Sequence, residues 1–351
     1  MTVVVTVLKD PRVRRTIESL LAQRRPPEEI LVDDGGGTDE VRKIAEELGR
    51  RDDRIRYLLA PGNIAESRNA ALEVATGEFV GFLDADEIAP PEWLERLLGA
   101  FGDPSVGFAG GPTPATPESL SNRTARFYDG YLRRFYDVVA RSHPHALPMG
   151  NSLWRSETLR SVRPLATFGG ARVGNEDHDA AVRAIRGGWT GVYVPDAWVG
   201  HDFSDLRLGS LWRKQRQYAA GGFHVWRRQG STYEATPARL LPYALVPLLA
   251  ALGAILLLPT PTRAVGLALL AFDGLFLGAL AAYLTLTGLL QRHRYPGLEY
   301  GALEILRRWA TLDGAARGAV AWLGRPGGAA PTDVRAAPPE NLKREGPSAR
   351  R

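Results

Sequence analysis

The chain has 351 residues, a hydrophobic content of 44% and a formal net charge of +5. This length predicts about two domains, and the apolar content is enough for a sizeable core. The small positive charge, without a recognisable nucleic-acid motif, gives no indication of nucleic-acid binding. The absence of cysteine excludes a disulfide framework, a thiolate zinc site and a cysteine nucleophile.

The first part of the chain alternates β-branched apolar segments with amphipathic ones. Strands are predicted over residues 2–8, 29–37, 54–60 and 78–86, and helices over residues 10–23, 38–50 and 65–77. Thr38 or Asp39 is predicted to cap the second helix. Strands separated by helices of this length predict βαβ units, and therefore an α/β fold with a mostly parallel sheet flanked by helices.

The middle of the chain mixes both kinds of element. A strand and a Gly- and Pro-rich loop are predicted after residue 103, followed by an aromatic, amphipathic helix over residues 120–142. A helix from about Asn175 precedes a strand-like segment over residues 189–203. Asn175 is the predicted N-cap of that helix, and the acidic residues of its first turn favour the helix dipole.

Two uncharged segments follow. Leu240–Leu258 has 19 residues without a charge, and Ala264–Leu290 has 27 residues with one charge, Asp273. Because about 20 apolar residues in a helix cross a bilayer, we predict a transmembrane hairpin with spans of about 240–258 and 264–290. The alternative is a pair of buried core helices. Asp273 within a span carries a penalty of about 2.5–3.5 kcal/mol, so it is expected to face protein rather than lipid.

Basic residues flank this pair of segments on both sides, whereas the connecting loop has only Arg263. The flanking residues are Arg213, Lys214, Arg216, Arg227, Arg228 and Arg239 before the pair, and Arg292, Arg294, Arg307 and Arg308 after it. The positive-inside rule therefore places both ends of the hairpin in the cytoplasm. The sequence thus predicts a multi-pass protein of the inner or plasma membrane, with the N-terminal domain on the cytoplasmic face.

Four segments are expected in all: a domain over residues 1–235, the hairpin over 236–294, an amphipathic helix over 295–324 and a disordered tail over 325–351. For the amphipathic helix two arrangements remain open. It either lies on the membrane surface or packs against the N-terminal domain.

Carboxylates gather where two of the predicted strands end. Asp84, Asp86 and Glu87 follow one strand, and Asp33 and Asp34 precede the glycines that end another. Ligands of parallel α/β sheets bind at the carboxyl ends of the strands. A divalent cation would relieve the repulsion between the acids, and oxygen ligands suit Mg²⁺ or Mn²⁺, with a diphosphate supplying the rest.

Each of these motifs has a simpler interpretation. Asp84 and Asp86 are also compatible with a solvated turn before Pro90. Arg68, in the predicted helix between the two acidic strand ends, either binds a phosphate or a base edge, or forms an ion pair with one of the acids.

Five segments together resemble a family 2 glycosyltransferase of the GT-A fold, from residue 2 to about residue 225. The segments are TVVVTVLKDPRVRRTIESLLAQ, EEILVDDGGGTDE, GNIAESRNAALEVATGEFVGFLDADE, MGNSLWRSETL and GNEDHDAAVRAIRGGWTGVYVPDAWVGHD. The order and spacing are those of the family. The loop VLKDP lacks the family's usual Pro and Asn, and DDGGG has an apparent extra glycine, so the resemblance does not extend to details of base recognition.

The resemblance implies metal-dependent transfer of a sugar from a nucleotide-diphosphate sugar, with inversion at the anomeric carbon. The residues implied to bind the donor are Thr6, Asp33, Asp34, Arg68 and Asp84, and those implied to bind Mg²⁺ or Mn²⁺ are Asp84, Asp86 and His201. Asp177 is the implied catalytic base, and Glu176 would orient the acceptor or hold Asp177. Helix capping for Asp177 and structural hydrogen bonding for His201 are the competing interpretations.

The membrane hairpin favours an acceptor in the bilayer, such as a hydroxyl of a polyprenyl-linked glycan. Transfer to polyprenyl phosphate is one alternative, and a non-catalytic, membrane-tethered nucleotide-sugar binding protein is another. The segment RQYAAG does not match the Gln-x-x-Arg-Trp signature of processive members, so we predict one sugar per cycle. Arg213, Arg216 and Gln217 lie in the region of that signature, and the two arginines would neutralise the leaving diphosphate or meet anionic lipid. The sugar, the base and the oligomeric state are not indicated.

Overall fold

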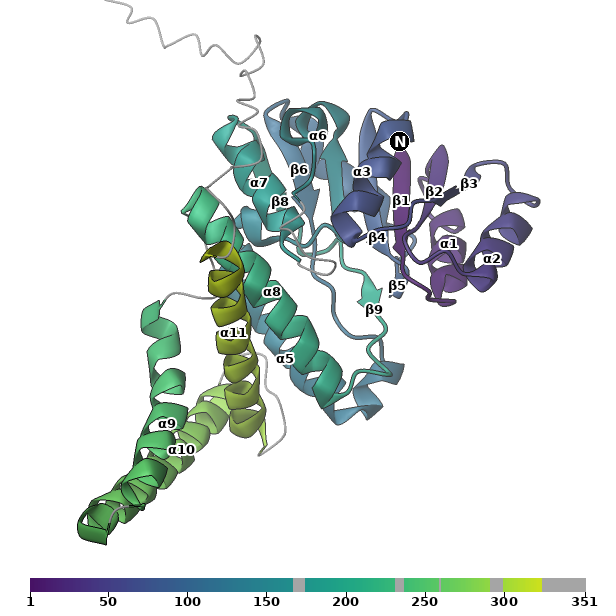
Figure 1. Cartoon of the computed structure of the whole chain (residues 1–351). Helices are drawn as coiled ribbons and strands as arrows, with labels where there is room; N and C mark the ends of the chain where they lie inside the picture. Colours follow the sequence, from purple (N-terminus) through teal and green to yellow (C-terminus); the bar gives the residue numbers. More distant parts are fainter. Residues whose placement is uncertain (167–173, 231–236, 259, 291–298, 324–351) are drawn as a thin grey trace, which may run out of the picture.

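In the computed structural model, the described residues are 1–166, 174–230, 237–258, 260–290 and 299–323 (Figure 1). The predicted tail over residues 325–351 lies outside them. So do residue 236, where the predicted hairpin begins, and residues 291–298, which include its predicted end. The described chain forms an α/β domain, from which two long apolar helices extend to one side.

The α/β domain is built on a seven-stranded sheet with the strand order β3-β2-β1-β4-β7-β6-β8. Its strands are β1 (Thr2–Val7), β2 (Glu29–Asp34), β3 (Ile55–Leu59), β4 (Phe79–Asp84), β6 (Val106–Gly110), β7 (Asn151–Arg155) and β8 (Thr190–Tyr193). All neighbours pair in parallel except β7, which is antiparallel to both β4 and β6. The predicted mostly parallel sheet is confirmed, and the antiparallel strand is an addition that the sequence pattern did not reveal.

Strand β1 shows why the sheet is buried on both faces. Val3 and Val5 pack into the core on one side of the sheet, and Val4 packs into the core on the other. Alternate side chains of a strand point to opposite faces, so a continuous β-branched run suits a strand covered by helices on both sides.

The two faces carry different helices. One core contains residues of α1 (Val13–Leu21), α2 (Asp39–Gly49) and α4 (Trp93–Leu98). The other contains residues of α3 (Ile64–Val74), α5 (Arg123–Phe135), α6 (Ser156–Val162) and α7 (Glu176–Arg186). The helices predicted for the first half of the domain are therefore present, and α4 and α6 were not predicted.

The helix caps differ in how well the sequence identified them. Thr38 accepts a hydrogen bond from the backbone N–H of Val41 at 3.5 Å, so it caps α2 as predicted. Asn175 occupies the N-cap position of α7 as predicted, but its side chain makes no capping hydrogen bond and its φ is 77°. Its Nδ2 donates instead to the backbone oxygen of Tyr218 on α8 (Leu208–Gln229), which joins α7 to α8.

A two-stranded ribbon brings distant residues together at the edge of the domain. Strands β5 (Glu87–Ile88) and β9 (Gly200–His201) pair antiparallel, with Glu87 opposite His201. Only β9 lies in a segment predicted to be strand-like. A two-residue strand has no period to detect, so β5 could not be identified from its sequence.

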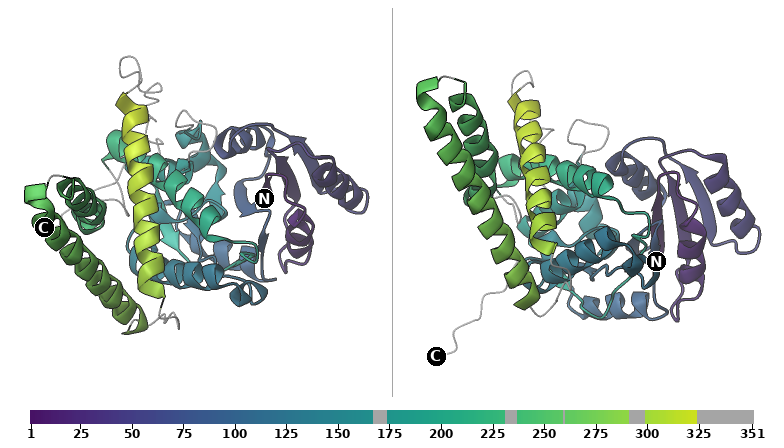
Figure 2. Two further views of the ribbon diagram at one scale, coloured as in Figure 1. Left: turned by 60° about the horizontal axis from the view of Figure 1, so that its bottom comes forward. Right: turned by 90° about the horizontal axis from the view of Figure 1, so that it is seen from below.

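The last described helix, α11 (Tyr300–Leu323), packs along α8 and lies between the α/β domain and the pair α9–α10 (Figure 2). The two backbones are in close contact, since a Cβ atom on Gly314 would lie 2.2 Å from the backbone oxygen of Arg216. On α11, Arg307 and Glu304 form a buried ion pair of 2.8 Å. Of the two arrangements left open for this segment, the structure shows packing against the domain.

The predicted hairpin corresponds to α9 (Pro237–Leu256) and α10 (Arg263–Leu290), which lie side by side (Figures 1 and 2). Within the described residues, one stretch is long and apolar enough to cross a membrane, Thr260–Leu290, with a mean hydropathy of 2.0. The apolar segment Leu240–Leu256 is shorter. Asp273 is only 6% exposed, so its side chain lies against protein, as expected for a charge in this helix.

Candidate active site

A cavity of about 1170 Å³ opens at the carboxyl ends of β1 and β4, where the sheet meets the start of α7 and one side of α8. We call it the cleft. Six of the nine predicted site residues line it: Thr6, Arg68, Asp84, Asp86, Glu176 and Asp177. The acidic strand end of β4 and the acidic start of α7, about ninety residues apart in sequence, therefore face one space.

Asp33 and Asp34 do not line this cavity. Both oxygens of Asp34 are used within the protein, because Oδ1 accepts hydrogen bonds from the backbone N–H groups of Gly36 and Gly37 at 2.8 and 2.9 Å and Oδ2 accepts one from Tyr57 at 3.0 Å. Asp33 accepts a hydrogen bond from the hydroxyl of Ser67 at 2.6 Å, and burial raises its pKa to about 6. The glycine turn therefore binds Asp34 and Ser67 binds Asp33, and neither acid lines the cleft.

Arg68 connects three of the predicted site residues. Its guanidinium donates to Glu176 Oε1 at 2.8 Å, to Asp84 Oδ1 at 2.9 Å and to Thr6 Oγ1 at 3.2 Å. The side chain is 2% exposed. Of its two proposed interpretations, the structure therefore shows the ion pair with an acid.

Asp86 and His201 form the second group. His201 Nε2 lies 3.2 Å from Asp86 Oδ2, and His201 Nδ1 lies 3.1 Å from Glu87 Oε1. Burial opposes the charged imidazole, but the two carboxylates outweigh it and raise the pKa of His201 to about 9. Burial also disfavours the charged form of Asp86, yet His201, Lys214 and Arg12 together lower its pKa below the usual range.

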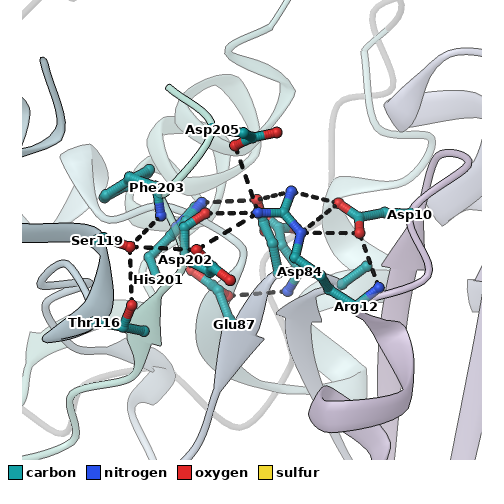
Figure 3. A network of polar contacts seen from close by, with 12 residues as sticks. Asp10, Arg12, Asp84, Glu87, Thr116, Ser119, His201, Asp202, Phe203 and Asp205 are labelled. Atoms are coloured by element: carbon teal, nitrogen blue, oxygen red, sulfur yellow. Dashed lines mark hydrogen bonds and ion pairs between the residues drawn. The ribbon is translucent and has the colours of Figure 1, made fainter. Parts of the chain in front are cut away.

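Arg12 is a residue that the sequence analysis missed. Its guanidinium pairs with Asp10 at 2.6 Å and with Asp86 at 3.6 Å, and it lies 3.8 Å from a carboxylate oxygen of Asp202 and 3.6 Å from one of Asp205. Figure 3 shows Arg12 among Asp10, Asp202 and Asp205, with His201 near Glu87. Arg12 therefore connects the loop after β1 to the loop after β9 across the cleft rim.

Asp177 lies at the start of α7 and lines the cleft. Its carboxylate accepts hydrogen bonds from the backbone N–H groups of His178 at 2.8 Å and Met149 at 3.4 Å. Burial raises its pKa. A carboxylate with a raised pKa that faces a cavity can accept a proton from a bound molecule.

Lys214 is a second residue whose place the sequence analysis missed. It was counted only with the basic residues before the hairpin, but its ammonium group lies 5.4 Å from the ring centre of Tyr128 and 5.3 Å from that of Phe203. Burial opposes its charge, while Tyr128, Asp86 and Asp84 raise its pKa. One helical turn separates Lys214 from Tyr218 on α8, and this spacing was the available signal that both face the cleft.

The chemistry of the donor set is compatible with a divalent cation. Among the residues that the structure describes, no group of three or more His, Asp or Glu side chains is placed to hold an ion. Asp86 and His201 supply an oxygen and a nitrogen ligand within 3.2 Å of each other. Two protein ligands are enough for a cation that takes its remaining ligands from substrate phosphates and water.

Comparisons with known proteins agree with this geometry. The sequence pattern of the family described as "Glycosyl transferase family 2" matches residues 2–157. The chain is 26% identical over 227 residues to the succinoglycan biosynthesis protein ExoM of Rhizobium meliloti (strain 1021), which covers 63% of this chain and 72% of ExoM. It is 35% identical over 96 residues to the putative teichuronic acid biosynthesis glycosyltransferase TuaG of Bacillus subtilis (strain 168), covering 27% of this chain and 38% of TuaG.

A solved structure has the same fold. The mannosyltransferase PcManGT from Pyrobaculum calidifontis, in complex with GDP-Man and Mn²⁺, superimposes with a TM-score of 0.57 at 19% identity, over 92% of this chain and 87% of that one. This likeness, together with the mostly parallel sheet and its covering helices, shows the GT-A fold. Within it, residues 2–157 form a domain of the family 2 glycosyltransferases.

The buried acid Glu176 leads to a prediction on pH. Burial and Asp177 raise its pKa from 4.5 to about 7, although Arg68 opposes the shift. The stability that protonated Glu176 contributes is therefore complete below about pH 4.5 and is lost as the pH rises through about 7. Glu176→Gln removes this titration. The melting temperature of Glu176→Gln minus that of the wild type should therefore increase by several °C as the pH rises across this window. The conversion used is about 2–4 °C per kcal/mol of unfolding free energy.

Thermal unfolding of the full chain in metal-free detergent buffer across this pH range measures the effect. Glu118→Gln, at an exposed position, is the matched control and should leave the pH profile unchanged. A constant difference between Glu176→Gln and the wild type would contradict the prediction.

Proposed function

We propose that this protein transfers a sugar from a nucleotide-diphosphate sugar to a hydroxyl group of a membrane-associated, polyprenyl-linked glycan, with inversion. The observation that carries the proposal is that Asp86, just after β4, and Asp177, in the first turn of α7, line one cleft at the carboxyl ends of parallel strands. The names of the relatives support it, since ExoM is a succinoglycan biosynthesis protein and PcManGT was solved with GDP-Man.

Asp86 and His201 are the proposed ligands of Mg²⁺ or Mn²⁺, and PcManGT was solved with Mn²⁺. When bound, the cation would neutralise the negative charge of the diphosphate. His201 must lose its proton to act as a ligand. In the absence of the cation, the positive charges of Lys214 and Arg12 stabilise the carboxylate of Asp86. Asp84, held by Arg68 at 2.9 Å, is proposed to lie beside the ribose.

Asp177 is the proposed catalytic base. It takes the proton of the acceptor hydroxyl as the oxygen forms a bond to the anomeric carbon, and the bond from that carbon to the diphosphate oxygen breaks. The ammonium group of Lys214, which faces Asp84 and Asp86, stabilises the negative charge of the departing nucleoside diphosphate. Glu176 is proposed to act indirectly, because its ion pair with Arg68 fixes the first turn of α7. One sugar is transferred per cycle.

The apolar helices are proposed to anchor the enzyme as a two-span hairpin. Their outer faces expose large apolar side chains, such as Leu248, Leu267 and Leu275 at 64%, 61% and 75%. Only 11% of the most apolar window of α10 is buried. Surfaces of this kind are suited to lipid. The basic flanks support our proposal that the catalytic domain lies on the cytoplasmic face of the cell membrane, where nucleotide sugars are made available.

The metal ligands can be tested without measuring turnover. Mn²⁺ together with a panel of nucleotide sugars that includes GDP-mannose and UDP-glucose should raise the melting temperature of the wild type. At a free ligand concentration one hundred times Kd, binding stabilises the folded state by about 2.7 kcal/mol. Asp86→Ala and His201→Ala should abolish the Mn²⁺-dependent part of the rise in melting temperature, whereas Asp196→Asn, at an exposed position, should retain it. If Mn²⁺ stabilised Asp86→Ala as much as the wild type, Asp86 would not be a metal ligand.

The base is tested by Asp177→Asn. Transfer to a hydroxyl acceptor should fall by about 10²–10⁴-fold, the usual contribution of a general base, while donor binding remains. Full transfer by this variant would favour polyprenyl phosphate as acceptor, because an anionic nucleophile needs no base. If the wild type neither hydrolyses nor transfers any donor, the non-catalytic binding protein becomes the better description.

The orientation of the protein in the membrane is tested with single-cysteine variants, because the native chain has no cysteine. Ser142→Cys is in the catalytic domain, and Thr260→Cys is between α9 and α10; both positions are exposed. A membrane-impermeant maleimide should label Thr260→Cys in right-side-out vesicles and Ser142→Cys in inverted ones. Labelling of both positions from the same side would exclude the two-span hairpin.

A further inference from the structure

A second cavity, of about 120 Å³, lies beside the cleft, and we call it the aromatic cavity. The two share a boundary, because Asp177, Lys214 and Tyr218 line both. The proposed base therefore faces the donor side and this second space at once. A molecule in the aromatic cavity would lie next to the group that accepts the proton.

The walls of this cavity combine aromatic side chains with polar groups. Tyr128, Tyr131 and Phe135 come from α5, and Tyr136 from the π-helical turn that follows it. Gln215 of α8 also lines it. Aromatic faces offer apolar contact area, and the hydroxyl and amide groups hydrogen-bond in a fixed geometry. A sugar ring has the matching chemistry, with C–H groups on its faces and hydroxyls on its edge.

Helix α11 completes the cavity. Thr311, which is 1% exposed, forms part of the wall. One turn before it, the guanidinium of Arg307 lies over the ring of Tyr131 at 4.0 Å, and Glu304 fixes that guanidinium. The tight approach of α11 to α8 at Gly314 holds this wall in place.

We propose that the aromatic cavity is the acceptor subsite, that it takes a neutral sugar ring of the glycan, and that α11 is an integral wall of it. The inference rests on the proposed function and goes further by naming the group that receives the sugar. The ring hydroxyl next to Asp177 loses its proton to that carboxylate and forms the new glycosidic bond, and the nucleoside diphosphate leaves on the cleft side.

The charges and the size of the cavity favour a neutral ring over polyprenyl phosphate. Two acids, Glu87 and Asp177, line it together with His201 and Lys214, and His201 is already engaged by Asp86 and Glu87, so little positive charge is left to attract a phosphate. Lys214 is already surrounded by the acids of the cleft. A space of about 120 Å³ suits a single ring rather than an isoprenoid chain. The lipid part of the acceptor would then lie outside, toward the apolar helices.

Filling the cavity tests the proposal. Gly222 of α8 lines it, and a Cβ atom there would have Asn175 Nδ2 at 3.8 Å as its nearest neighbour, so a side chain can enter without displacing backbone. Gly222→Leu should reduce transfer to methyl glycosides at least tenfold, through a raised acceptor KM. Gly209→Leu is the matched control. It is on the same helix, lines neither cavity and should transfer normally.

A second variant tests the ring platform. Tyr131→Leu keeps apolar bulk but removes the aromatic face, and it should raise the acceptor KM about three- to tenfold, as expected for the loss of one aromatic contact. Donor-dependent thermal stabilisation with Mn²⁺, and slow hydrolysis of the donor by water, should be unchanged in Gly222→Leu and Tyr131→Leu. If the substitutions only damaged the fold, donor-dependent stabilisation and donor hydrolysis would fall together with transfer.

The outcomes are distinguishable. If the wild type shows no donor-dependent stabilisation and no hydrolysis, the proposed function itself fails. If it shows both but Gly222→Leu transfers to methyl glycosides as well as Gly209→Leu does, only the acceptor subsite is overturned. Saturation-transfer NMR adds a direct probe. Methyl glycosides should bind the wild type and not Gly222→Leu, whereas binding of citronellyl phosphate that depends on Gly222 would also overturn the proposal.

Discussion

The buried guanidinium of Arg68 is the interaction on which the cleft depends. It joins the end of β4, through Asp84, to the first turn of α7, through Glu176, and both acids lie far from it in sequence. Taking these charges out of water is costly, and removing one partner of such a group typically destabilises a protein by about 3–5 kcal/mol. The arrangement therefore adds little net stability, but it fixes the helix that presents Asp177 relative to the strand that presents Asp86.

The sequence was informative where the signal was local and periodic. The β-branched runs and the helical spacing of the first half predicted β1 to β4 and the helices between them, and the acids at the end of β4 predicted the position of the cleft. The capping role of Thr38 was predicted for the same reason, because it depends on a donor only three residues away. Local rules also predicted the N-cap position of Asn175, but not that its side chain would bond to a residue on another helix instead of capping α7.

The remaining parts of the site depend on contacts between distant segments. Nothing in the residues around Asp34 indicates that two glycines, Gly36 and Gly37, will direct their N–H groups to its carboxylate, or that Tyr57 will donate to it. The pairing of Glu87 with His201 requires two short strands that are more than one hundred residues apart. Lys214 and Arg12 are two basic residues in an arginine-rich chain until the fold places them beside Asp86.

The position of α11 has a consequence for how the enzyme is made. Thr311 follows both apolar helices in the chain, yet it completes a wall of the α/β domain. During translation, both apolar helices therefore leave the ribosomal exit tunnel before α11 does. A nascent chain that has folded its sheet still lacks one side of the aromatic cavity, so this cavity is completed only after both apolar helices have been synthesised.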